Sequence, residues 1–388
     1  MKVFLLLFLQ KKKNLAVGFA MKVIVVGAGV FGASVAYHLV RAGAEVTVFD
    51  RDDAGRATSA GAGIVCPWLS AREDEAWLPL AYGAGRYYPQ LVQDLAAEGE
   101  TDLGYRRVGL LVVPDEAKQL DVVEQRLAVR RQVAPEMGVV TRVSAEQAVA
   151  MFPALRPGQP ATHIENAARV NGRLMADGLL RAAQKRGAEV RAGSPEIVAD
   201  SGAVRGVRVD GAVVGADAVV VTAGAWAPAL LAPLGVSLRV EPQKGQIVHL
   251  RMNGVDTSLW PVLQPMNSFY LLTFDDSRVV IGATREYGSG FDYRVTAEGQ
   301  KAVLDVALAV APGLADGELI ETRIGFRPMA ADELPMIGAV SGMPGLFVGN
   351  GLGPSGLTLG PYAGRLLAEA VLGRASEVDL AGYDPLRG

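Results

Sequence analysis

The chain has 388 residues, of which half are hydrophobic and a fifth are charged, and its net charge is −3. This composition is enough for a buried core in about two domains, and no long basic run outside the N-terminus indicates a nucleic-acid partner. The single cysteine, Cys66, excludes an internal disulfide and a multi-cysteine metal site, and the three histidines show no metal-ligand spacing. We therefore expect no metal, and a reducing, cytoplasmic compartment.

The first twenty residues differ from the rest of the chain. The apolar run Val3–Leu9 is too short to span a bilayer. Lys11, Lys12 and Lys13 follow this run, whereas a secretory signal carries its positive charge before it. We interpret residues 1–20 as a disordered leader, or as an upstream start with Met21 as the working start, and secretion is the alternative. Nothing beyond this leader suggests a membrane anchor, so membrane association is left open.

The next segment predicts a βαβ unit. The continuous apolar run Val23–Val26 is typical of a parallel strand that is buried on both faces. Helix-forming residues fill Gly32–Arg41, and Gly43 is a plausible stop. A second buried strand is predicted over Val46–Phe49.

The middle of the chain changes from helical to strand-like patterns. Residues 73–98 and 115–133 predict helices, and Ser144-x-x-Gln147 is a capping-box pattern that opens another. The later predicted elements are a helix over Leu174–Lys185 that stops at Gly187, an antiparallel strand over Val204–Val209, a buried strand over Ala218–Val221, and several strands between Leu238 and Ile281. The tail again predicts strand, glycine loop and helix.

This order predicts an α/β fold. We expect a Rossmann-like nucleotide-binding domain built from separated segments, with an inserted α+β substrate domain that has a mainly antiparallel sheet. The expected limits are 21–85, 145–235 and 322–388 for the first domain, and 86–144 and 236–321 for the second.

A glycine-spaced loop, Gly27-Ala28-Gly29-Val30-Phe31-Gly32, joins the first strand to the first helix. Gly27 permits a tight turn, Gly29 lets the backbone approach a pyrophosphate, and Gly32 lets the helix pack closely on the strand. Asp50 ends the second strand, where a carboxylate can accept hydrogen bonds from a ribose. The pattern predicts a dinucleotide but does not distinguish NAD from FAD.

Further glycine clusters occur in "TSAGAGIVCP" (Thr58–Pro67), "VVTAGAW" (Val220–Trp226) and "GNGLGPSGLTLGP" (Gly349–Pro361). A cofactor that touches all of them is long and extended. With "KGQ", "GFRPMAADELPMIG" and the order of these motifs, the sequence resembles the glycine/D-amino-acid oxidase and dehydrogenase superfamily of flavoproteins, along Met21–Gly373. Glycine oxidase and sarcosine oxidase belong to that superfamily.

The resemblance implies a non-covalent, extended FAD that contacts four loops. The matching residues are Gly27, Gly29, Val30, Phe31 and Gly32 at the pyrophosphate; Asp50 at the ribose and Arg51 near the adenosine; Ser59, Ala60, Gly61 and Gly63 along the pyrophosphate and flavin; Thr222, Ala223, Gly224 and Trp226 on the adenosine side; and Gly353, Ser355, Gly356, Leu357 and Thr358 at the pyrimidine end of the flavin. At that last end, backbone N–H groups and a helix N-terminus would stabilise the negative charge of reduced flavin.

The resemblance also implies a substrate site. Arg327 matches the arginine that holds the substrate carboxylate, with the two parallel hydrogen bonds that a guanidinium offers. Tyr270 matches a substrate-binding tyrosine, and Arg285 lies near the position that shapes the pocket around the side chain, where it would favour an acidic or polar substrate. Asp332 and Glu333 are interpreted as structural. In this superfamily a hydride moves from the carbon that bears the amine to flavin N5, and the imine hydrolyses to an oxo acid, so we nominate no acid–base residue.

Three departures from the family pattern limit the transfer. No cysteine follows the substrate strand, so the covalent flavin link of sarcosine oxidase is not supported, and Cys66 is interpreted as a packing residue. Val280 stands where sarcosine oxidases carry a lysine that helps oxygen to react, which puts fast oxygen reduction in doubt. Pro354 replaces a basic residue of glycine oxidases, which puts glycine in doubt as the substrate.

The leading hypothesis is an FAD-dependent oxidoreductase that acts on a D-amino acid, glycine, or an N-methyl or cyclic amino acid. The electron acceptor would be oxygen, a quinone or a redox protein, and the oligomeric state is unknown. The alternatives are 2-hydroxy-acid or glycerol-phosphate oxidation on the same fold, a non-catalytic FAD relay subunit, and an NAD-dependent dehydrogenase.

Overall fold

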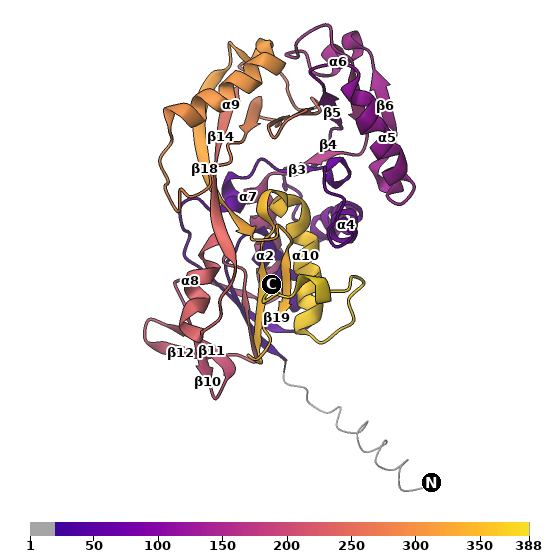
Figure 1. Ribbon diagram of the computed structural model, residues 1–388. Helices are drawn as coiled ribbons and strands as arrows, with labels where there is room; N and C mark the ends of the chain where they lie inside the picture. The colour runs from indigo at the N-terminus through magenta and orange to yellow at the C-terminus, as the bar shows by residue number, and fades with distance from the viewer. Residues whose placement is uncertain (1–19, 388) are drawn as a thin grey trace, which may run out of the picture.

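The computed structural model describes residues 20–387, so the predicted leader lies outside the described residues apart from Ala20. Two sheets, of six and eight strands, organise this part of the chain. Figure 1 shows α9 (Ala297–Val310), α6 (Ala145–Met151) and β6 (Val140–Val143) at one end of the molecule. The strands β10 (Glu196–Asp200), β11 (Ala203–Val209) and β12 (Ala212–Gly215) lie at the other end.

The six-stranded sheet has the order β19-β20-β13-β1-β2-β9 and is parallel except for the antiparallel pair β19–β20. Its strands are β1 (Lys22–Val26), β2 (Glu45–Asp50), β9 (Glu189–Ala192), β13 (Ala218–Val221), β19 (Met336–Ala339) and β20 (Leu346–Asn350). Of the three runs that predicted buried strands, those in β1 and β13 are fully buried, and Val46, Val48 and Phe49 are buried in β2. The predicted α/β, Rossmann-like fold class is confirmed.

Helices cover one face of this sheet and a small sheet covers the other. Helix α2 (Val30–Arg41) packs against α7 (Gly172–Lys185) and α10 (Gly356–Val371), and α10 also contacts α4 (Leu78–Ala97). On the opposite face, the antiparallel strands β10 (Glu196–Asp200), β11 (Ala203–Val209) and β12 (Ala212–Gly215) pack with α8 (Ala227–Leu231) against the parallel strands.

The eight-stranded sheet has the order β18-β14-β17-β16-β15-β5-β7-β6, and its neighbours are antiparallel except for β15 and β5. Its other strands are β5 (Leu110–Val113), β7 (Ala161–Ile164), β14 (Val240–Arg251), β15 (Val262–Pro265), β16 (Tyr270–Thr273), β17 (Arg278–Gly282) and β18 (Glu318–Ala330). Helix α9 packs on β14 and β17, and α5 (Gln119–Arg131) packs on β6 and β7. The sheet is mainly antiparallel, as predicted for the substrate domain.

The domain limits stay a prediction. Strand β7 and most of β18 pair in the eight-stranded sheet, although their residues fall within the segments 145–235 and 322–388 that we expected in the nucleotide-binding domain. A second three-stranded sheet is formed by β3 (Ile64–Val65), β8 (Ala168–Arg169) and β4 (Arg106–Arg107), and it belongs to neither of the two main sheets.

Local signals agree with the structure in several places. The capping box of α6 is formed, since Gln147 N donates to Ser144 Oγ at 3.3 Å and Ser144 N donates to Gln147 Oε1 at 2.8 Å. Helices α4 and α5 occupy the two segments that predicted helices. Within residues 20–387, none of the helices combines the length and the apolar character that a membrane span requires.

Candidate active site

A cavity of about 1190 Å³ lies between the two main sheets. It exceeds the range of about 300–1,000 Å³ that is usual for drug-sized ligands, as an extended dinucleotide requires. Its lining includes Gly27, Gly61, Gly224 and Gly356, one residue from each glycine-rich loop. The fold therefore brings the four loops to one cavity, although more than 300 residues of chain separate the first from the last.

The first loop is built for a close backbone approach. Gly27 has a φ of +107°, and a Cβ atom there would lie 2.6 Å from the carbonyl oxygen of Thr222, so only glycine fits. Gly29, Val30 and Phe31 line the cavity. Gly32 does not line it; a Cβ atom at Gly32 would lie 1.9 Å from Gly27 O, which shows that this glycine keeps α2 close to the loop.

The predicted ribose acid, Asp50, lines the cavity and braces the loop at the same time. Its Oδ2 accepts from Ala28 N at 2.6 Å, and its Oδ1 accepts from Asp52 N at 2.7 Å and from Arg56 Nη1 at 3.1 Å. Arg51 also lines the cavity and pairs with Asp53 at 2.7 Å.

The second and third loops contribute backbone and one aromatic ring. Ala60, Gly61 and Gly63 line the cavity, as do Thr222, Ala223, Gly224 and Trp226. Trp226 stacks on Phe291 with 5.1 Å between ring centroids. Ser59 is the exception, because it lines a smaller neighbouring cavity and its carbonyl accepts from Arg173 Nε at 3.1 Å.

The fourth loop opens helix α10. Its cavity-lining residues are Gly353, Pro354, Ser355, Gly356, Leu357 and Thr358. Thr358 Oγ1 donates to Ile64 O at 2.7 Å, which ties this helix to the second loop. The residues before α2 and α10, Gly29 and Ser355, make no side-chain cap. Thr58 Oγ1 accepts from Val30 N, and the other first-turn N–H groups of the two helices are available at the cavity wall. Such groups suit a pyrophosphate and the polar edge of a flavin, so the residues present fit FAD.

The opposite end of the cavity, at the eight-stranded sheet, holds the predicted substrate residues. Arg327 lies on β18, and its Nη1 donates to Gln243 Oε1 at 2.9 Å and to Thr284 O at 3.0 Å. Gly245 leaves room for this guanidinium, because a Cβ atom there would lie 2.8 Å from Arg327 Nη2. Tyr270, at the start of β16, also lines the cavity.

Two further arginines line this end, Arg285 and Arg126. Arg285 is exposed and makes no hydrogen bond or ion pair with any residue of the described range. Arg126 comes from α5; its Nη2 donates to Leu69 O at 3.4 Å, and its buried Nε has no partner there. Burial, reinforced by the charge of Arg130, lowers the pKa of Arg126. Within residues 20–387, the acids that line the cavity are Asp50, Asp53 and Glu196, all on the side of the six-stranded sheet.

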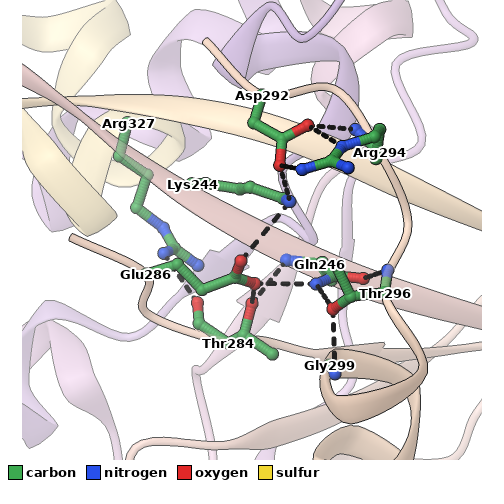
Figure 2. Close-up of polar contacts among 9 residues, drawn as sticks. All are labelled: Lys244, Gln246, Thr284, Glu286, Asp292, Arg294, Thr296, Gly299 and Arg327. Carbon is green, nitrogen blue, oxygen red and sulfur yellow. Dashed lines mark hydrogen bonds and ion pairs between the residues drawn. The ribbon is translucent and has the colours of Figure 1, made fainter. Parts of the chain in front are cut away.

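An ion network around the buried side chain of Lys244 lies behind the substrate end (Figure 2). The Lys244 side chain is 1% exposed, and its Nζ lies 3.4 Å from Glu286 Oε2 and 3.5 Å from Asp292 Oδ2. Gln246 Nε2 donates to Glu286 Oε1 and to Thr296 Oγ1, each at 2.8 Å. Lys244 and Gln246 alternate along β14 with the cavity-lining Gly245 and Ile247, as side chains of a strand do.

Comparisons with known proteins identify the family. The profile of the DAO family, described as FAD dependent oxidoreductase, matches residues 22–370. The chain belongs to this family. The predicted resemblance is thereby confirmed, and FAD is the cofactor of the family.

Members of the FAD-dependent oxidoreductase family that resemble this chain cover nearly all of it. The uncharacterized oxidoreductase YurR of Bacillus subtilis is 52% identical over 93% of this chain and 98% of its own length. The glycine oxidase of Pseudomonas aeruginosa is 34% identical over 94% of this chain and 98% of its own length. The crystal structure of iminodiacetate oxidase (IdaA) from Chelativorans sp. BNC1 has a TM-score of 0.92 and 51% identity, and it covers 94% of this chain and 98% of its own.

Family membership makes this protein an oxidoreductase that acts on amino-acid C–N bonds, and it sets aside the NAD-dependent alternative. When bound, FAD supplies the acceptor for the hydride that leaves the substrate carbon. The roles of individual residues stay predictions. Cys66 lines the cavity, and burial raises its pKa to about 12, so its thiol stays protonated at neutral pH.

The sequence analysis missed several residues that shape the site. Thr58 Oγ1 accepts from Val30 N at 3.0 Å, next to the pyrophosphate loop. Gln243 and Thr284 hold Arg327, and Arg126 joins the cavity from a distant helix. The motif "KGQ" contained a signal for Lys244 and Gln246, but not for Gln243 before it, and a pattern along one strand does not show which partners lie across from it.

Proposed function

We propose that this enzyme oxidises a small amino acid that carries two carboxylates, with iminodiacetate as the best candidate. The observation that carries the proposal is the charge of the substrate end of the cavity. Three arginines line it, none of them pairs with an acid of the described residues, and no described acid lines that end. A substrate with one carboxylate would compensate one of these charges, whereas a dicarboxylate compensates two.

The residues divide the work of binding. Arg327 holds the carboxylate beside the reacting carbon, with a guanidinium already oriented by Gln243 and Thr284. Arg285 binds the second carboxylate, and Tyr270 offers its hydroxyl to the polar middle of the substrate. The 51% identity with a protein described as iminodiacetate oxidase supports this choice.

The chemistry requires positioning more than acid–base catalysis. A C–H hydride leaves the substrate carbon, the amine loses its proton to water, and a C=N bond forms. Water then adds to the imine and the C–N bond breaks, which for iminodiacetate gives glyoxylate and glycine. The cavity wall holds the carboxylates while these bonds change, and apolar lining such as Ile247 and Leu110 limits water near the reacting carbon.

The test is anaerobic mixing of the flavin-loaded enzyme with iminodiacetate, glycine, sarcosine, proline, D-amino acids and 2-hydroxy acids while flavin absorbance is followed. We expect iminodiacetate to bleach the flavin at the lowest concentration, with glyoxylate and glycine as products. Preference for a monocarboxylate, or bleaching by 2-hydroxy acids alone, would contradict the proposal. A flavin that no substrate bleaches would instead favour the relay-subunit alternative. Admission of air then shows whether oxygen accepts the electrons.

A further inference from the structure

Residues 284–296, the segment that carries Arg285, are bound to β14 by contacts near both ends of the segment. At the near end, Lys244 N donates to Glu286 O at 3.0 Å, and Glu286 N donates to Lys244 O at 2.9 Å. At the far end, Thr296 N donates to Gln246 Oε1 at 3.0 Å. Between them, Asp292 reaches back to the ammonium group of Lys244.

Glu286 is the centre of this network. Its Oε1 accepts from Thr284 Oγ1 at 2.6 Å and from Gln246 Nε2 at 2.8 Å, while its Oε2 faces Lys244 Nζ (Figure 2). Burial alone would raise the pKa of Glu286, but the hydrogen bonds from Thr284 and Gln246, with the charge of Lys244, outweigh it and lower the pKa. The carboxylate is therefore ionised at neutral pH, and its interactions with these partners are charge-assisted.

The contacts of Glu286 lead to both arginines of the proposed substrate site. The hydroxyl of Thr284 donates to Glu286 Oε1, and the carbonyl of Thr284 accepts from Arg327 Nη1. Arg285 lies between Thr284 and Glu286 in the chain, and its side chain makes no hydrogen bond or ion pair with a described residue. The backbone position of Arg285 alone therefore determines where its guanidinium can reach. Strand β14 also carries Gln243, the other acceptor of Arg327. Contacts with this one strand therefore position both Arg327 and the segment of Arg285.

We propose that Glu286 and Lys244 are positioning residues that set the spacing between Arg285 and Arg327, and so select substrates by the distance between two carboxylates. This inference rests on the proposed function. Neither Lys244, on β14, nor Glu286, which pairs with it, lines the cavity, so the pair acts only through the two arginines.

The test compares a dicarboxylate with a monocarboxylate. In Glu286→Gln, the KM for iminodiacetate should rise about tenfold, because the loss of charge-assisted bonds frees the Arg285 segment. The KM for sarcosine should rise less than about threefold, and the kcat should stay within about threefold for both. An equal rise for the two substrates would overturn the inference in favour of a purely structural role.

A double-mutant cycle with Arg285→Met shows whether the effect passes through Arg285. If it does, adding Glu286→Gln to Arg285→Met should change the KM for iminodiacetate by less than about twofold. Additive effects would overturn the inference. If Arg285→Met itself leaves the preference for iminodiacetate over sarcosine unchanged, the second-carboxylate part of the proposed function fails, which is a distinguishable result.

Two further variants protect the test against loss of folding. The Lys244→Met/Glu286→Gln double variant removes both charges of the pair, so neither partner is left as a buried charge without the other. It should show the same selective rise in the KM for iminodiacetate. Normal selectivity in this variant would contradict the inference. Asp305→Asn, in the exposed pair with Lys301 on α9, is the matched control and should leave both KM values and flavin content unchanged.

Discussion

The two ends of the cavity hold arginines in different electrostatic situations. At the six-stranded sheet, Arg51 pairs with Asp53 and Arg56 pairs with Asp50. At the eight-stranded sheet, Arg126, Arg285 and Arg327 line the cavity without an acidic partner among residues 20–387. The first group is neutralised by the protein and shapes a loop, whereas the second is available to an anion that enters from outside.

This difference affects how much each charge can contribute. Exposed ion pairs such as Arg51–Asp53 typically contribute about 0–1 kcal/mol. A guanidinium that meets a substrate carboxylate away from water contributes more, because breaking such a pair leaves an uncompensated charge. Removal of an unpaired arginine should therefore affect substrate turnover more than removal of a paired one affects the fold.

The largest expected effect is that of Arg327→Met. The variant loses the oriented guanidinium, so kcat/KM should fall about 10²–10⁴-fold for iminodiacetate and for monocarboxylates alike, which corresponds to about 3–5 kcal/mol. Steady-state kinetics with flavin content checked by absorbance measure this. Arg142→Met, which removes an arginine that pairs with Asp121 and Glu124 on the surface, is the control. A fall below tenfold would show that Arg327 does not hold the reacting carboxylate.

Gly32→Ala tests the other end of the cavity. A Cβ atom would lie 1.9 Å from Gly27 O and 2.4 Å from Thr222 Oγ1, so helix α2 must move away from the loop. We expect a loss of about 3 kcal/mol in the free energy of unfolding, together with weaker FAD binding. Denaturant titration and flavin content measure both. Gly215→Ala, whose Cβ would meet only Arg205 O at 3.8 Å, is the control, and equal behaviour of the two variants would contradict the packing role of Gly32.

The nucleotide end was the more predictable of the two. Its signals are local: an apolar run predicts a buried strand, glycines mark positions that a Cβ atom would block, and an acid ends the next strand. The structure places Gly27, Asp50, Gly61, Gly224 and Gly356 on one cavity, while Gly32 packs behind the loop. The separate loops meet because parallel strands carry them to the same region.

The substrate end was less predictable because its contacts join distant segments. Arg327 was identified only through the resemblance, and its partners Gln243 and Thr284 lie across strand pairings that no local pattern shows. Arg126 lies on α5, and the sequence of this helix is typical of an ordinary surface helix. The domain limits stay a prediction for the same reason, since β7 pairs with β5 and β6 through the fold and not through proximity in the chain.

The arginines and the buried His249 respond differently to a change of pH. Arginines keep their charge across the accessible range, but His249 on β14 is 2% exposed, and neither ring nitrogen has a hydrogen-bond partner among residues 20–387. Glu321 Oε1 lies 3.9 Å from its Nδ1. Burial, with the charges of Arg323 and Arg278, lowers the pKa of His249 from 6.5 to about 3. The unfolded chain therefore binds one more proton between these values, and stability, fully present above pH 6.5, should fall as the pH is lowered.

The expected slope from His249 is about 1.4 kcal/mol for each pH unit between pH 6 and pH 4. Urea titrations of the native protein and of His249→Phe, at half-unit pH steps, measure the difference between the two curves. Carboxylates away from this histidine contribute equally to both proteins and cancel, whereas Glu321, with its Oε1 3.9 Å from His249 Nδ1, does not. Parallel curves would mean that the histidine is protonated in the folded state.

The smallest expected effect is that of Arg126→Met, and it tests whether the unpaired charges act together. Arg126 comes from α5, whereas Arg285 and Arg327 come from the segment around β14 and β18, so we expect Arg126 to act on the substrate at longer range. Its removal should raise the KM for iminodiacetate by about two- to fivefold, equivalent to at most about 1 kcal/mol, and the KM for sarcosine by less. Because a long-range interaction is screened by salt, the difference from the native enzyme should shrink between about 0.02 M and 0.5 M ionic strength. A large rise that salt does not reduce would instead mean that Arg126 contacts the substrate directly, and the second carboxylate would then belong to Arg126 and not to Arg285.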